Sequence, residues 1–123
     1  MGYNRHMKTL YHPPVGEITV DGVLYALSDP VRAQIFAELV AAECPLSCSV
    51  LLQRSDQTLP KSTLSQHFKV LRESGLVRST RKGVEMLNTS RCQELRERFG
   101  PLIEAILNAY AIQHQDRTAA NAG

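Results

Sequence analysis

The sequence predicts a mainly α (α+β) fold with about five helices and one two-stranded β-hairpin. Apolar residues recur at helical spacing in several segments, prolines and glycines separate these segments, and two short β-prone runs flank a glycine at position 83. With 123 residues, of which 43% are hydrophobic, the chain suffices for one compact domain with its own core. We expect this domain to span residues 15–114, with flexible ends at residues 1–14 and 115–123.

The first two helices are predicted between residues 20 and 42. Four apolar residues recur at positions i, i+3, i+4 and i+7, which is the spacing of one helix face: Val20, Val23, Leu24 and Leu27. Asp29 can cap the next helix, and Pro30 suits its first position because a missing N–H costs nothing there. The second helix runs to about Ala42, and its inward-facing residues are Val31, Ile35, Phe36 and Leu39.

Two further helices are predicted on either side of a polar loop. Pro45 ends the second helix, and a short third helix is expected from Cys48 to about Arg54. After the loop at 55–58, Pro60 opens a fourth helix, and Gly75 can adopt the left-handed conformation that ends it near Ser74. Its buried stripe is Leu64, Phe68 and Leu71, and its opposite side carries Ser62, Ser65, Gln66, Lys69 and Glu73.

A β-hairpin and a final helix complete the predicted domain. Residues 76–80 and 84–88 are the β-prone runs, and the loop Arg81-Lys82-Gly83 between them is expected to form a cationic tip with glycine at positive φ. The last helix starts at Ser90, and Gly100-Pro101 is expected to kink or split it. Its apolar stripe would pack on the first helix or on a partner subunit: Leu95, Phe99, Leu102, Ile103, Ile106 and Tyr110.

Basic residues concentrate in one part of the chain. The formal net charge is only +2, but residues 60–91 hold seven Lys or Arg against two Glu, which gives this stretch +5 and leaves −3 for the rest. Such an asymmetry indicates a basic face that can meet a polyanion, although a solvated charged surface is the alternative. No apolar run approaches the roughly 20 residues that span a bilayer, and residues 1–14 lack a secretory signal, so we expect a cytoplasmic protein without membrane contact.

This order of elements is that of a winged helix-turn-helix, in which one helix enters the major groove of DNA and the hairpin lies beside it. Gln66 is the expected base reader because its amide can pair bidentately with adenine. Arg78, Arg81 and Lys82 are the expected contacts to phosphates or to the minor groove. The sequence shows no glycine-rich phosphate loop, no His-Glu-x-x-His and no nucleophile with its base, so an enzyme is not expected. The alternative function is a protein-interaction module, because fold does not fix function.

Three segments carry a family resemblance: ALSDPVRAQIFAEL, KSTLSQHFKVLRESGLV and RSTRKGVEMLN. They resemble the ArsR family of bacterial winged-helix repressors, over about residues 13–110. The resemblance implies a homodimer, formed mainly through the first and last helices, that binds an imperfect palindrome in double-stranded DNA and leaves it when an inducer arrives. The implied recognition-helix contacts are Lys61, Ser62, Thr63, Ser65, Gln66, His67 and Lys69, to which we add the nearby Arg72. The implied dimer interface contains Val20, Val23, Leu24, Leu102, Ile103, Ile106 and Tyr110.

The three cysteines leave the inducing signal open. Cys44, Cys48 and Cys92 are an odd number with irregular spacing, which argues against a disulfide framework. Metal-sensing ArsR proteins carry a Cys-x-Cys pair near the third helix, whereas the matching stretch here is Ser47-Cys48-Ser49, so we expect no metal and no other cofactor. The cysteines are then either inert apolar side chains or a redox set, and the inducer is an unidentified small molecule or an oxidant.

Overall fold

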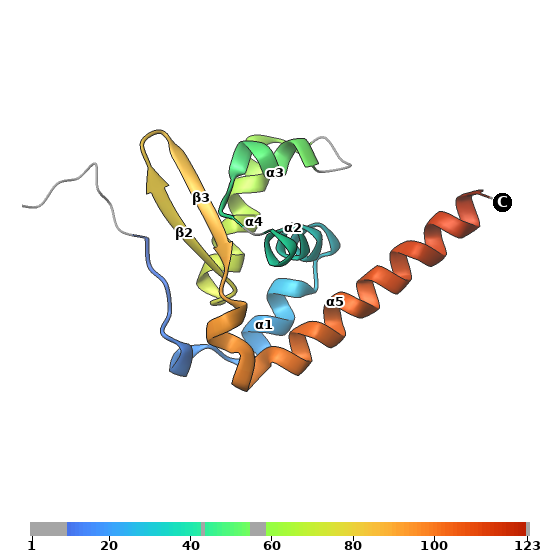
Figure 1. Cartoon of the computed structure of the whole chain (residues 1–123), viewed down its shortest axis with the longest axis horizontal. Helices are drawn as coiled ribbons and strands as arrows, with labels where there is room; N and C mark the ends of the chain where they lie inside the picture. The colour runs from blue at the N-terminus through green and yellow to red at the C-terminus, as the bar shows by residue number, and fades with distance from the viewer. Residues whose placement is uncertain (1–9, 43, 55–58, 123) are drawn as a thin grey trace, which may run out of the picture.

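The computed structural model describes residues 10–42, 44–54 and 59–122, and within them it has the predicted mainly helical winged fold (Figure 1). A short 3-10 turn at Val15–Glu17 precedes the first helix. The elements follow in the order α1 (Val20–Leu27), α2 (Pro30–Ala41), β1 (Leu46–Ser47), α3 (Cys48–Arg54), α4 (Lys61–Glu73), β2 (Val77–Lys82), β3 (Glu85–Ser90) and α5 (Cys92–Ala122).

Local capping sets the helix boundaries where the sequence predicted them. The Asp29 carboxylate accepts the N–H groups of Val31 at 2.8 Å and Arg32 at 3.1 Å, and Pro30 occupies the first position of α2. After α4, Gly75 has a φ of 92°, as a left-handed helix end requires. A Cβ at this glycine would meet the side chain of Ile18, so both the backbone conformation and the available space call for glycine.

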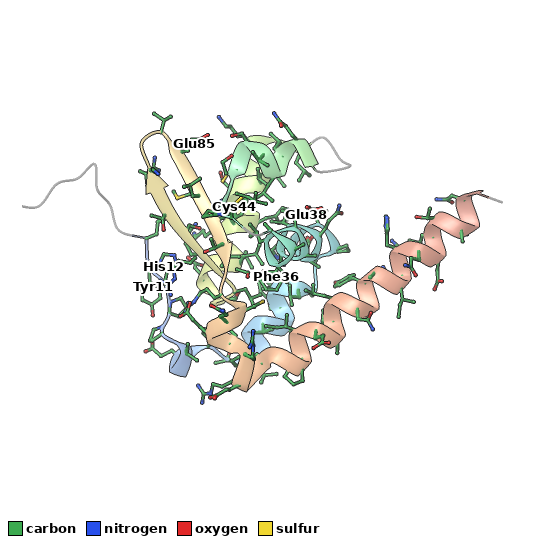
Figure 2. All side chains as sticks on the ribbon, viewed as in Figure 1. Tyr11, His12, Phe36, Glu38, Cys44 and Glu85 are labelled. Atoms are coloured by element: carbon green, nitrogen blue, oxygen red, sulfur yellow. The ribbon has the colours of Figure 1, made fainter. Side chains whose placement is uncertain are left out.

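The core lies between the helices and one face of the sheet. Phe36 of α2, labelled in Figure 2, is fully buried, and α2 contacts α1, α4, α5 and β3. The other large side chains with almost no exposed surface come from the helices and the sheet: Val23, Leu27, Leu71, Leu76, Val77, Asn88 and Leu95. Burial of the apolar side chains in this set holds α4 and the hairpin in fixed positions relative to each other.

The sheet has a third strand that the sequence did not predict. Its order is β1-β3-β2 and both pairings are antiparallel, with Leu46 opposite Asn88 and Ser47 opposite Leu87. Strands β2 and β3 extend two residues beyond the predicted runs, so that Arg81 and Lys82 belong to β2 and the turn is Gly83-Val84. A two-residue hairpin turn favours positive φ, and Gly83 has a φ of 64° as predicted.

Helix α5 is longer than predicted and is not split. It runs without interruption through Pro101 and continues to Ala122, past residue 114, where the sequence placed the end of the domain. Its first turns lie at an angle to the long remainder, and its C-terminal end extends away from the other elements (Figure 1). A change of direction lets a helix accommodate the ring and the missing N–H of an internal proline. In the described part of the chain, no helix is long and apolar enough to cross a membrane.

The segment before the 3-10 turn lies against the hairpin. The Nε2 atom of His12 accepts the backbone N–H of Ser79 in β2 at 3.0 Å, and Figure 2 shows His12 beside this strand. The next carbonyl, that of Pro13, accepts a hydrogen bond from the buried Arg91 at 2.8 Å. Residues 12 and 13, which fall in the part of the chain expected to be flexible, therefore make specific contacts with the sheet and with the residue before α5.

Candidate nucleic-acid interface

Helix α4 presents a polar face to solvent. Its buried face consists of Leu64, Phe68 and Leu71, as predicted, together with His67. Five of the α4 residues expected to contact DNA are exposed, and Thr63 is half-buried. The exposed residues are Lys61, Ser62, Ser65, Gln66 and Lys69. These side chains are short or flexible and can donate or accept hydrogen bonds, which is what a helix needs in order to approach base edges in a groove.

His67 does not lie on this face, contrary to expectation. Only 9% of the residue is exposed, and within the described residues its Nδ1 atom has no hydrogen-bond partner. The position is three residues after Leu64 and four before Leu71, which is the spacing of the buried stripe. Helical periodicity could have placed His67 inside, whereas the family resemblance placed it among the DNA contacts.

Arg72 connects α4 to the hairpin. Its side chain is half-buried, and its Nη1 atom donates to the Ser79 hydroxyl of β2 at 3.4 Å. The residue is therefore positioned to fix the hairpin relative to α4 and is less available to DNA than Lys61 or Lys69.

The hairpin carries two exposed cations close to its turn. Arg81 and Lys82 are exposed at the end of β2, and the neighbouring Val84 is 97% exposed. Glu85, which Figure 2 places at the end of the hairpin, is the register partner of Lys82. Adjacent residues of a strand point to opposite faces, so Arg81 and Lys82 can reach different phosphates along a duplex.

Arg78 has an intramolecular partner. Its Nη2 atom lies 3.1 Å from each carboxylate oxygen of Glu94, which the buried Arg91 also contacts. The hydrogen bond from Arg91 is the main cause that holds the pKa of Glu94 below its usual value, and Arg78 adds to it. Since Glu94 stays ionised, it compensates part of the Arg78 charge, and we expect Arg78 to attract phosphate less than Arg81 does.

A buried polar network that the sequence did not reveal holds the sheet together. Asn88 of β3 has no exposed surface, and its Oδ1 atom accepts the Ser79 hydroxyl of β2 at 2.8 Å. Its Nδ2 atom donates to the Leu46 carbonyl of β1 at 3.2 Å and to the Met86 carbonyl at 3.3 Å, and it lies 3.5 Å from the Cys48 sulfur. One amide therefore joins all three strands and, through Ser79 and Arg72, reaches α4.

Comparison with known proteins gives this geometry a context. Residues 27–80 match a family described as a helix-turn-helix domain. An ArsR-like transcriptional regulator from Rhodococcus sp. RHA1 has a similar structure, with a TM-score of 0.53 and 27% identity over 81% of this chain and 86% of its own. The transcriptional repressor BigR from Xylella fastidiosa aligns with a TM-score of 0.56 and 28% identity, over 76% of this chain and 85% of its own.

The chain carries an ArsR-like winged helix-turn-helix. A third similar structure is Rv0081 of M. tuberculosis, with a TM-score of 0.58 and 28% identity over 86% of this chain and 98% of its own. No sequence among the curated proteins matches. In this fold α4 takes the place of the recognition helix, and the β2–β3 hairpin is the wing.

The ArsR-like domain exposes part of the expected dimer face. Val20 and Leu24 of α1 are 54% and 47% exposed, and Tyr25 beside them is 64% exposed. Leu102, Ile106 and Tyr110 of α5 are half-buried, and the Tyr110 hydroxyl donates to the Leu27 carbonyl at 2.6 Å.

Two residues expected at the dimer face lie elsewhere. Val23 is fully buried and Ile103 is only 4% exposed, so both belong to the core of the ArsR-like domain rather than to its surface. The innermost residue of an amphipathic stripe faces its own core, and only the flanking residues stay available to a partner.

The cysteines of the ArsR-like domain are free thiols. Cys44 is exposed, while Cys48 and Cys92 are half-buried. Burial is the main cause that raises the pKa of Cys92, which reduces its thiolate fraction and therefore its reactivity. Within the ranges that the structure describes, no cluster of three His, Cys, Asp or Glu side chains could hold a metal ion.

Proposed function

We propose that this protein is a sequence-specific DNA-binding transcriptional repressor that acts as a homodimer on a palindromic operator. The observation that carries the proposal is the exposed polar face of α4 beside a wing with two exposed cations. A polar row that includes Gln66 suits base reading, and Arg81 and Lys82 suit phosphate contacts. The similarity to the Rhodococcus regulator and to BigR supports the same class of function.

The homodimer is proposed from the exposed apolar residues of α1. Val20 and Leu24, one helical turn apart, form a row that water would otherwise hydrate, and Leu102 and Ile106 of α5 are half-buried. A two-fold axis through this face would place one α4 helix in each half of a palindrome. The two α4 helices are then expected to lie about 34–36 Å apart, one turn of B-DNA.

The primary test is a fluorescence anisotropy titration against the protein's own promoter region and against scrambled DNA, at two salt concentrations. We expect the promoter to bind more tightly, and affinity to fall steeply with salt because phosphate contacts release counterions. Equal and weakly salt-dependent binding of both duplexes would reject the proposal and favour a protein-interaction module.

Two variants separate base reading from phosphate binding. Gln66→Ala should reduce discrimination at one base pair by about 1–3 kcal/mol, whereas Arg81→Ala should weaken all sequences alike and reduce the salt slope by about 0.9. Gln115→Ala, an exposed glutamine near the end of α5, is the matched control and should change neither quantity. Similar losses on promoter and scrambled DNA for Gln66→Ala, or a loss confined to the promoter for Arg81→Ala, would refute the assignments.

The dimer is tested by light scattering. Leu24→Glu should shift the protein towards the monomer, because it places a charge within an apolar interface. Val40→Glu changes another exposed apolar residue, 40% exposed on α2, and should leave the mass unchanged. A wild-type monomer at working concentration would contradict the homodimer.

A further inference from the structure

An open hollow lies between α2 and the C-terminal half of α5. Its volume is about 380 Å³, within the roughly 300–1,000 Å³ of small-molecule sites. In Figure 1, α5 passes beside α2 before its end extends into solvent. The hollow exists because small side chains face it, with Ala33 and Ala37 on α2 and Ala111 on α5.

The lining changes in character along α5. Leu107 and Tyr110 are half-buried and form an apolar wall with the alanines, and the hydrogen bond from the Tyr110 hydroxyl to the Leu27 carbonyl fixes the tyrosine. One to two turns further on, His114 and Arg117 line the same hollow and are exposed. An apolar wall is thus followed by side chains that can donate hydrogen bonds, and Gln113 is among them.

The charge at this end of the hollow is uncompensated. Among the residues that the structure describes, no Asp or Glu lines the hollow, and Arg117 has no ion-pair partner. A guanidinium beside an apolar wall favours a ligand with both an anionic group and an apolar body. The anionic group can then pair with the guanidinium while the apolar body contacts the apolar wall.

The proposed dimer does not account for this hollow. Of the seven residues expected at the dimer interface, only Tyr110 lines it. Val20 and Leu24 of α1 are absent from the lining, as are Leu102 and Ile106 of α5. A second copy seated on the proposed dimer face would therefore not need to fill the space between α2 and α5.

We propose that the hollow between α2 and α5 binds a small amphipathic anion, with its apolar body against Leu107, Tyr110 and the alanines and its carboxylate or sulfonate at Arg117. His114 is placed to donate a second hydrogen bond to the same group. This proposal goes beyond DNA binding and does not depend on it, so it is tested without DNA.

The test uses two fluorescent probes that share an apolar body. One is 8-anilinonaphthalene-1-sulfonate, and the other is N-phenyl-1-naphthylamine, which lacks the sulfonate. Arg117→Gln should weaken the sulfonate probe about fivefold and leave the uncharged probe within about twofold, because only the ionic contact is lost. Arg96→Gln removes an exposed arginine of α5 outside the hollow and should affect neither probe.

A second variant tests the apolar wall. Ala111→Phe fills the hollow from an exposed helix position, where folding is not at risk, and should weaken both probes at least about tenfold. Circular dichroism and light scattering accompany each titration. Unchanged binding of both probes in Arg117→Gln and Ala111→Phe would refute the site. A change of oligomeric mass in Ala111→Phe without probe would equally refute it, because the hollow would then be a contact between subunits.

Discussion

Replacing Asn88 by alanine should destabilise the domain more than any other change to a single polar residue of the sheet. The Asn88 amide is fully buried and hydrogen bonds to strands β1 and β2 at once, through the Leu46 carbonyl and the Ser79 hydroxyl. Alanine removes both bonds, so the Ser79 hydroxyl loses its acceptor and the Leu46 carbonyl loses this donor inside the protein.

The expected loss follows from these contacts. The two lost hydrogen bonds cost about 1 kcal/mol each, or about 2 kcal/mol together. The small cavity adds to this, and the free energy of unfolding should fall by about 3 kcal/mol. For a domain of this size that corresponds to a melting temperature lower by roughly 10 °C.

The assay is urea unfolding followed by circular dichroism, at one fixed protein concentration because association would add to the measured stability. Asn108→Ala, an exposed asparagine of α5, is the matched control and should change stability by less than about 0.5 kcal/mol. A loss below about 1 kcal/mol for Asn88→Ala, with an unchanged m-value, would show that the network does not stabilise the sheet as argued.

Two further predictions concern pH and glycine. Burial is the main cause that lowers the pKa of His12, so the folded state binds the proton less readily, and stability should fall as pH drops below about 6.5. Glutamine in His12→Gln can still accept the Ser79 N–H, but it does not titrate. The stability of this variant, measured by unfolding at pH 7.5 and 5.5, should therefore lose this part of the pH dependence. Parallel pH profiles for the wild type and His12→Gln would contradict the prediction. Gly75→Ala should cost about 2–4 kcal/mol because its Cβ meets Ile18, whereas Gly83→Ala, with open space, should cost about 1 kcal/mol. Equal melting temperatures for the two glycine variants would refute the steric argument.

The helical part of the fold was predictable because its signals are local. The cap at Asp29 and the glycines at 75 and 83 depend on residues within a few positions of each other, and all three were predicted correctly. The same periodicity that identified the α4 stripe also places His67 inside it. His67 was assigned to the DNA contacts because of the family resemblance. The helical spacing of α4, taken alone, places it on the buried face.

The sheet was less predictable because its pairing is not local. Strand β1 has two residues, and it becomes a strand only by pairing with residues 87 and 88, about forty positions later. Nothing near Asn88 indicates that its amide would be buried, since its partners at Leu46 and Ser79 come from other strands. The assignment of particular α4 residues as DNA contacts stays a prediction. Exposure shows which side chains of α4 are available to DNA, but it does not show which of them contact it.

The contact between His12 and Ser79 bears on how the protein can be handled. Strand β2 forms one edge of the sheet, and the Ser79 N–H donates to His12 rather than to β3. An uncovered edge strand is a template on which another molecule can add a strand, which leads to aggregation. Trimming the chain past His12, a usual step to improve crystals or yield, would uncover this donor and should make the shortened protein more prone to aggregate at high concentration.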